Sequence, residues 1–328
     1  MSATLEFVSV NPLVSVQDVG RRGAMHIGVS ESGPMDWARH RLALRLVDLP
    51  AGGPAVEVGL GGLAVAAHGG PVRLALTGPG FKARTREGSW TAPVALTLAP
   101  GDRLEVSAGS DGLWGYLAVA DADWGAGVLG SHATNVRTGL GARDFAAALP
   151  CAAAARLDAP VEYIDPLSGG AVALLPGPQH HLFSNEAHAA LGEEPYRLTP
   201  QIDRMGYRLE GPKLVAPGGH DIISDGIVEG SIQVPGNGQP IVLMADRAPT
   251  GGYPKIAVVA SVDRPRLSQM RPGDTVRFAW STREAALTRR RALASLVDQP
   301  QPRRRTVFSP QFLFERNLVD GVWPPRED

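Results

Sequence analysis

The stretch QPIVLMADRAPTGGYPKIAVVASV (residues 239–262) joins two apolar runs through a polar loop. Each run has the length of a buried strand and is bounded by proline or glycine, as strands in β proteins are. Between them an acid, a guanidinium, two glycines, a phenol and a lysine fall within positions 246–255. Such groups suit a small polar ligand, because glycines allow close backbone approach and charged groups orient it. The stretch therefore predicts a β protein whose chemistry lies on a loop that follows a strand.

Short alternating segments bounded by glycine and proline recur along the rest of the chain. Examples are PVRLALTG (71–78), PVALTLAPGDRLEVSAG (93–109), AVALLPG (171–177) and TVRFAW (275–280). Helical patterns are confined to residues 35–49 and 281–299, each followed by proline. Many strands and few helices predict a mainly β protein built from barrels or sandwiches.

Two pairs of turn sequences suggest an internal repeat. LALTGPG (74–80) resembles ALLPGPQ (173–179), and PGDRLEV (100–106) resembles PGDTVRF (272–278). If the repeat is real, the chain holds two related barrels, and the second carries an insertion containing residues 202–254. Chance similarity of short turns is the alternative. The expected domains are residues 1–168, residues 169–285, and a helix with a basic tail over residues 286–328.

Composition and charge exclude several classes of protein. The 328 residues leave room for about two domains, and the formal net charge of −1 gives no global field that would attract nucleic acid. Cys151 is the only cysteine, so there is no internal disulfide framework. No apolar run approaches the roughly 20 residues that span a bilayer, and no secretory leader is recognisable. We expect a cytoplasmic protein that binds neither nucleic acid nor membrane.

Two apparent motifs do not withstand a physical test. VGLGGLA (58–64) fits a dinucleotide-binding pattern, but the sequence continues as alternating strands, with no helix and no acid at the required place. His180, His181 and His188 lack the spacing and carboxylate partner of a metal site. We therefore expect no metal and no covalently bound cofactor.

Three polar, glycine-rich segments carry the candidate site residues. They span residues 16–43, 200–214 and 225–259. In the first, Ser30 or Ser32 could cap the helix that follows. Asp246, at the end of a strand, stands where a base or an acceptor for an amide N–H would stand. The candidate catalytic residues are Asp246, Tyr253 and Lys255, with Arg204 expected near the cleft of the last two. The candidate substrate-binding residues are Asp18, Arg21, Ser32, Asp36, Asp203, Arg204, Gln233, Asn237 and Arg247.

These segments, in this order, resemble the allophanate hydrolase subunit 2 family, which includes the C subunit of 5-oxoprolinase and KipA-like proteins. The family is also called the biotin-dependent carboxyltransferase family. The resemblance rests on motifs such as VQDVGRRG, GVSESGPMDWAR, DRMGYRLEG and GSIQVPGNGQPIVLMADRAPTGGYPKIA, which begin at residues 16, 28, 203 and 230. It implies two cyclophilin-like β-barrel domains. Departures from the family pattern include Asp203, where the family typically has asparagine, and much of residues 120–158.

The resemblance also implies a function. It favours the C subunit of a heteromeric, ATP-dependent 5-oxoprolinase, which hydrolyses 5-oxoproline to glutamate and is inactive alone. The implied partners are a KipI-like subunit 1 protein (the B subunit) and a LamB/YcsF-type protein (the A subunit), with ATP used by the complex at an unassigned site. One alternative is the carboxyltransferase component of a biotin-dependent urea or amide carboxylase or of an allophanate hydrolase-type system, with biotin on another chain. A second is a non-enzymatic, KipA-like regulatory partner. Both enzymatic substrates present a planar amide.

Overall fold

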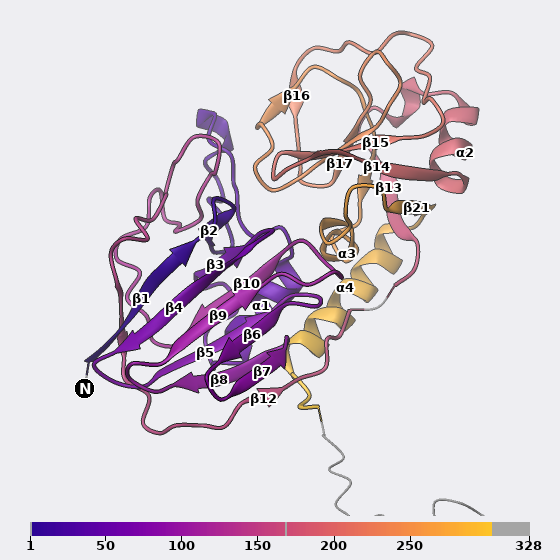
Figure 1. Ribbon diagram of the computed structural model, residues 1–328. Helices are drawn as coiled ribbons and strands as arrows, with labels where there is room; N and C mark the ends of the chain where they lie inside the picture. The colour runs from indigo at the N-terminus through magenta and orange to yellow at the C-terminus, as the bar shows by residue number, and fades with distance from the viewer. Residues whose placement is uncertain (1, 168, 304–328) are drawn as a thin grey trace, which may run out of the picture.

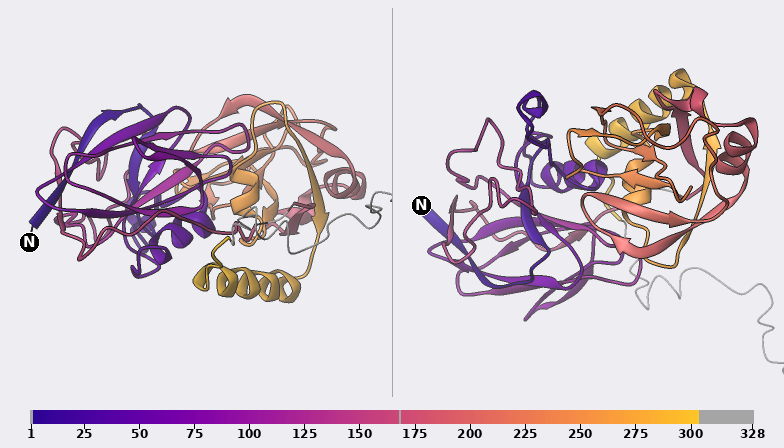
Figure 2. Two further views of the ribbon diagram at one scale, coloured as in Figure 1. Left: turned by 60° about the horizontal axis from the view of Figure 1, so that its bottom comes forward. Right: turned by 90° about the horizontal axis from the view of Figure 1, so that it is seen from above.

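The computed structural model describes residues 2–167 and 169–303, and these form two halves that lie side by side (Figures 1 and 2). The N-terminal half contains two six-stranded sheets, and the C-terminal half contains a closed barrel of seven strands. Helices α3 (Arg264–Ser268) and α4 (Arg283–Asp298) lie near the junction of the halves (Figure 1). The expected basic tail from residue 304 onward lies outside the described residues.

The two N-terminal sheets share one apolar core. Leu5 and Val65 of one sheet cluster with Leu74 and Leu117 of the other, so the sheets pack face to face. The first sheet has the order β11 (Leu149–Ala152), β1 (Ser2–Val10), β4 (Gly62–His68), β9 (Arg103–Ser107), β6 (Lys82–Thr85), β7 (Gly88–Thr91). The second has the order β12 (Val161–Glu162), β8 (Val94–Leu98), β5 (Val72–Thr77), β10 (Gly115–Val119), β3 (Ala55–Val58), β2 (Val14–Gln17).

The C-terminal barrel closes through a parallel pairing of its first and last strands, in which Val172 lies opposite Phe278. Around the barrel the strands are β13 (Val172–Pro176), β20 (Lys255–Val259), β17 (Ser231–Gln233), β18 (Ile241–Leu243), β15 (Gly206–Glu210), β14 (Pro195–Ile202) and β21 (Thr275–Trp280). A small ribbon of β16 (Asp225–Gly226) and β19 (Thr250–Gly251) stands beside it. Two of the three polar segments, residues 200–214 and 225–259, therefore lie in the barrel and connect its strands, whereas residues 16–43 belong to the N-terminal half.

Four α-helices occur among the described residues, namely α3, α4, α1 (Trp37–Arg45) and α2 (Asn185–Glu193). Two short 3₁₀ turns, η1 (Met25–Ile27) and η2 (His180–Leu182), complete the set. Helices α1 and α4 confirm the two helical predictions. The expected serine cap of α1 is wrong: Asp36 caps it, its carboxylate accepting hydrogen bonds from the amides of Ala38 and Arg39. No described helix is long and apolar enough to cross a membrane.

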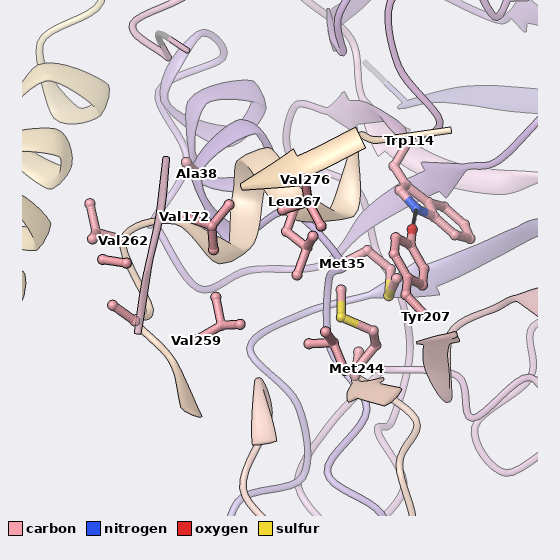
Figure 3. Close-up of a cluster of buried hydrophobic side chains, with 14 of the residues drawn as sticks. Met35, Ala38, Trp114, Val172, Tyr207, Met244, Val259, Val262, Leu267 and Val276 are labelled. Atoms are coloured by element: carbon pink, nitrogen blue, oxygen red, sulfur yellow. Dashed lines mark hydrogen bonds between the residues drawn. The ribbon is translucent and has the colours of Figure 1, made fainter. Parts of the chain in front are cut away.

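A single apolar core continues across the junction of the halves (Figure 3). Met35 and Trp114 of the N-terminal half cluster there with Tyr207 and Met244 of the barrel. The indole N–H of Trp114 donates a hydrogen bond of 3.1 Å to the hydroxyl of Tyr207. Because large buried side chains of each half pack on the other, the junction is held by the same kind of contact as a domain interior.

The expectation of two barrels is wrong for the N-terminal half. Its sheets end in the edge strands β11, β7, β12 and β2, whereas only the C-terminal sheet closes. Alternating residues predict a strand with one buried face, but not whether the first and last strands meet. The cyclophilin-like description remains an expectation from the family resemblance.

The expected insertion at residues 202–254 is also wrong, because strands β15, β17 and β18 within it belong to the barrel itself. The sequence echoes do not extend to strand pairing. β13 and β21 are neighbours, but their counterparts β5 and β9 lie in different sheets. The segments expected as strands are nonetheless confirmed as β5, β8, β9, β13, β18, β20 and β21.

Helix α1 buries a histidine that makes folding stability depend on pH. The His40 ring is 1% exposed, packs edge-on against Tyr116 and lies 3.0 Å from the carbonyl of Gln17. Burial lowers the pKa of His40 to about 4, against about 6.5 in the unfolded chain. As the pH falls, the unfolded state therefore takes up the proton first. Stability from this group is complete above about pH 6.5 and is lost progressively down to about pH 4, by about 3 kcal/mol in total.

We expect the variant His40→Gln to show a flatter loss of unfolding free energy between about pH 6.5 and 4 than the parent chain. Glutamine keeps an N–H that can bond to Gln17 but does not titrate. Denaturant unfolding at several pH values measures the difference. His68→Gln, which removes an exposed histidine, is measured beside it, so that the effect of the buried ring is compared with that of a surface ring. The prediction would be contradicted if the unfolding free energies of the parent chain and of His40→Gln fell equally steeply between about pH 6.5 and 4.

Candidate functional site

A pocket of about 520 Å³ opens between the two halves, and we call it the Asp246 pocket. Its wall is largely apolar with a few charged groups, which is the usual make-up of a small-molecule site. The N-terminal half contributes Leu13, Leu60, Leu113, Trp114, Val136 and Arg137, and the barrel contributes Ile202, Asp203, Arg204, Met205, Tyr207 and Asp246. A ligand here would touch both halves at once.

Asp246 and Arg204 form a buried pair in the wall of this pocket. Asp246 follows β18, and Arg204 lies in the turn between β14 and β15. The guanidinium donates two bonds of 3.0 Å to the two carboxylate oxygens, Nε to Oδ2 and Nη2 to Oδ1. Oδ2 also accepts the amide N–H of Val136 at 3.2 Å, from the N-terminal half. Both side chains are less than a tenth exposed, so this is a desolvated, bidentate ion pair.

Arg204 also reaches across the junction to the N-terminal half. Its Nη1 pairs with the carboxylate of Glu57, and its Nη2 donates a bond of 2.7 Å to the carbonyl of Gly33. Burial opposes the positive charge, but Glu57 and Asp246 outweigh it and raise the pKa of Arg204. Arg204 therefore carries a fixed charge shared between two acids, one from each half.

Glu57 is enclosed on every side. It is fully buried in β3, and its Oε2 accepts the amide of Met35 at 2.8 Å and the hydroxyl of Tyr116 at 2.9 Å. Burial raises the pKa of Glu57, while the nearby Arg204 charge acts in the opposite direction. Glu57 is absent from the residues that line the pocket, so it supports Arg204 from behind.

The pocket wall retains capacity to bind a ligand. A carboxylate offers about four acceptor positions, and the protein fills three on Asp246, two on Oδ2 and one on Oδ1. Oδ1 can therefore accept one more N–H. Arg137, also in the wall, contacts the sulfur of Met205 at 3.3 Å, and no acid among the described residues forms an ion pair with it. An N–H acceptor and a free cation thus line the same cavity.

Tyr253 lines a different cavity, which we call the Tyr253 pocket. It measures about 590 Å³ and is also lined by Asp203, Gln233 and Arg247. The two pockets share only the rim formed by Ile202, Asp203 and Met205. The structure therefore gathers these four predicted residues, and of the four only Asp203, at the shared rim, also lines the pocket of Arg204 and Asp246.

Lys255 lies in neither of these two pockets. It is fully buried on β20, with its Nζ 3.3 Å from the carboxylate of Asp225. That carboxylate also accepts the side-chain amide of Gln179 at 2.9 Å. The expected common cleft of Arg204, Tyr253 and Lys255 is thus not formed, because Arg204 lines the Asp246 pocket, Tyr253 lines the Tyr253 pocket and Lys255 is buried apart from both. The catalytic roles of Tyr253 and Lys255 stay predictions.

Two acids of the first polar segment, Asp18 and Asp36, form hydrogen bonds and an ion pair within the protein. Asp18 accepts hydrogen bonds from the amides of Gly20 and His132 and from the hydroxyl of Ser131, which ties two loops together. Asp36 caps α1 and pairs with Arg39 at 2.6 Å. Both carboxylates are therefore occupied by the protein itself.

Arg21, Ser32 and Asn237 have fewer contacts. Arg21 is 1% exposed; its Nε donates a bond of 3.1 Å to the carbonyl of Val128, and its two terminal nitrogens have no hydrogen-bond partner among the described residues. Ser32 accepts a 3.3 Å bond from the side-chain amide of Asn135 and lines a cavity of about 610 Å³. Asn237 is exposed and holds a turn by accepting the amide of Gln239.

The departure at Asp203 has a simple structural explanation. Its Oδ1 accepts the amides of Met205 and Gly206 at 2.7 and 3.0 Å, closing the turn that carries Arg204. The carbonyl oxygen of an asparagine side chain could accept the same two bonds. The exchange therefore preserves the turn and adds one negative charge at the shared rim of the two pockets.

The histidines give no metal site. The His188 ring contacts the carbonyl of His180 at 2.9 Å. Across the described part of the chain, no group of three or more histidine, cysteine or acidic side chains is placed to hold a metal ion.

Sequence reasoning missed Glu57, Trp114, Tyr116 and Arg137. Glu57 carried a usable signal, because it is the one charged residue in the otherwise apolar strand AVEV, and a lone acid on a buried strand needs a partner. No local sequence pattern marks Arg137 as a site residue. It lines the pocket because a loop of the N-terminal half lies against the barrel, where Arg137 contacts Met205.

Comparison with known proteins defines the class. The sequence matches the family model of the carboxyltransferase domain, subdomains A and B, over residues 27–280, and the chain belongs to this family. It is 34% identical to the C subunit of 5-oxoprolinase from Escherichia coli over 292 residues, which covers 87% of this chain and 94% of that protein. The C subunit of 5-oxoprolinase from Haemophilus influenzae is 31% identical over 300 residues, with coverage of 88% and 94%. The resemblance inferred from the motifs is confirmed.

A solved structure shows the same architecture. The crystal structure of the Kluyveromyces lactis urea carboxylase superposes with a TM-score of 0.79 at 25% identity, and the match covers 90% of this chain. The match spans only 29% of that longer chain. This fold therefore also occurs as one part of a much larger enzyme.

Proposed function

We propose that this chain is the C subunit of a heteromeric, ATP-dependent 5-oxoprolinase. The observation that carries the proposal is the full-length relationship to two proteins of that name, each covered over 94% of its length. In this reaction water is added across the lactam C–N bond of 5-oxoproline to give glutamate, and ATP hydrolysis drives the opening.

The Asp246 pocket offers a group for each polar part of this substrate. The free acceptor position on Asp246 would take the lactam N–H, and Arg137 would take the carboxylate. Trp114 and Leu113 supply apolar surface for the ring. Because Arg204 and Val136 hold Asp246 in place, its lone pair is oriented before the substrate arrives.

A carboxyltransferase acting on urea or a related amide is the second candidate. It is supported by the urea amidolyase of Lachancea kluyveri, which is 25% identical over 308 residues, although the match spans only 17% of that protein. Urea itself is neutral, so under this candidate Arg137 would bind the carboxylate that is transferred, on carboxybiotin or on the carboxylated product. The guanidinium of Arg137 therefore fits a carboxylate in either reaction, and the full-length relationship to the 5-oxoprolinase subunits is what favours the first candidate.

The assay that tests the proposal is turnover of 5-oxoproline with ATP, measured on the chain alone and after adding a KipI-like subunit 1 protein together with a LamB/YcsF-type protein. We expect no turnover from the chain alone and ATP-dependent glutamate release from the complex. A specific complex should bury at least about 1,000 Å² in total. Full activity without partners, or no association with the subunit 1 protein, would sink the proposal.

We expect Asp246→Asn to lower the turnover of the complex by about 10²- to 10³-fold, because an oriented acceptor is lost. The same change also weakens a buried ion pair and so lowers stability. Glu57→Gln is the matched control, since it removes the other acid bound to Arg204 without touching the pocket. If both variants lose activity only in proportion to their loss of folded protein, Asp246 has a structural role alone.

We expect Arg137→Gln to raise KM for 5-oxoproline by at least about tenfold, because one charge-assisted bond to the carboxylate is lost. Stability should be unchanged, since the side chain is exposed. Arg137→Lys keeps the charge and should recover part of the affinity. Steady-state kinetics of the complex measure the effect, and an unchanged KM in Arg137→Gln would show that the carboxylate binds elsewhere.

A further inference from the structure

A second cavity between the halves is lined by five arginines, and we call it the arginine cleft. It measures about 610 Å³ and shares no residue with the Asp246 pocket. The arginines are Arg22, Arg41, Arg247, Arg264 and Arg290. Two glutamates, Glu31 and Glu229, are the only acids in its lining. His40 also lines it, but burial lowers the pKa of that ring to about 4, so it is neutral at pH 7. The lining has an excess of three positive charges.

The two glutamates are already committed to arginines. Glu31 pairs with the buried Arg247 at 2.6 Å, and Glu229 pairs with Arg264. Arg41 is paired outside the lining, with Asp298 at the end of α4.

Arg22 and Arg290 remain, and no acid among the described residues forms an ion pair with either. Arg290 lies over the ring of Trp37, 3.1 Å from its centroid. Burial, followed by the charges of Arg264 and Arg41, lowers the pKa of Arg290 to about 10. Its guanidinium is thus held partly out of water and close to other cations.

An excess of cations in a partly desolvated cleft is electrostatically unfavourable, and a bound anion relieves it. A guanidinium matches phosphate oxygens in a bidentate geometry, and several guanidiniums together suit an anion that carries several charges. A single carboxylate would neutralise only one of the two guanidiniums, Arg22 and Arg290, that have no acid partner among the described residues. The volume lies within the range of ordinary ligand sites.

We propose that the arginine cleft binds an anion with two or more phosphate groups, with Arg22 and Arg290 as the guanidiniums free to contact it. Arg247, 3% exposed and fixed by Glu31 and by the carbonyl of Ile227, forms a preorganised wall of the site. Both halves contribute, since Arg22 and Arg41 come from the N-terminal half and the other three arginines from the C-terminal half.

Pyrophosphate binding to the isolated chain tests the proposal, by isothermal titration and by the rise in Tm with ligand at low salt. We expect saturable binding to one site. Arg290→Gln and Arg22→Gln should each weaken it by at least about tenfold, as loss of a charge-assisted bond does. Arg291→Gln is the matched control, because it removes the same charge from the next position of α4, outside the cleft. It should bind as the parent chain does.

Further ligands identify the anion. Comparable affinity for ATP and pyrophosphate would support a site for the phosphate chain alone, and tighter ATP binding would add a contact to the nucleoside. Succinate or orthophosphate binding as tightly as pyrophosphate would overturn the proposed class. Absence of pyrophosphate binding, or equal weakening in Arg291→Gln, would overturn the site. None of these measurements uses 5-oxoproline turnover, so a negative binding result would not count against the proposed function, and a negative turnover result would not count against the anion site.

Discussion

The buried guanidinium of Arg204 is the interaction on which the two-half arrangement depends. It holds Glu57 and the carbonyl of Gly33 on one side and both oxygens of Asp246 on the other. Breaking a buried ion pair by removing one member typically costs about 3–5 kcal/mol, because the remaining charge is left unpaired. The apolar junction around Trp114 and Tyr207 permits close packing of the halves, but the ion pairs fix their register.

The position of Asp246 serves both the packing of the two halves and the pocket between them. Asp246 is at once a link between the halves and the residue with a vacant acceptor position in the pocket wall. A carboxylate on a free loop would have to be ordered when a ligand bound, whereas Asp246 is already held by Arg204 and Val136. Preorganised polar groups of this kind contribute most to catalysis because they need no rearrangement during the reaction.

The sequence predicted the local structure well and the tertiary contacts poorly. Alternation and turn residues predicted strands such as β5, β20 and β21, because those signals lie within a few neighbouring residues. Closure of the barrel depends on β13 meeting β21, some 100 residues apart in the chain, and no local pattern encodes it. The loop at residues 246–253 was correctly singled out as polar and glycine-rich, yet its side chains turned out to line separate cavities.

The separation of those cavities follows from the backbone itself. Asp246 and Arg247 are adjacent, but Asp246 lines the pocket that holds Arg204, whereas Arg247 lines the arginine cleft and the Tyr253 pocket. The two residues close a tight turn, in which the amide of Arg247 donates a hydrogen bond of 3.2 Å to the carbonyl of Met244, and their side chains leave this turn toward different cavities. Each member is anchored by an ion pair, Asp246 to Arg204 and Arg247 to Glu31 of the N-terminal half. A change of packing at either cavity would therefore act on the same turn, so this dipeptide is a direct physical connection between the Asp246 pocket and the arginine cleft.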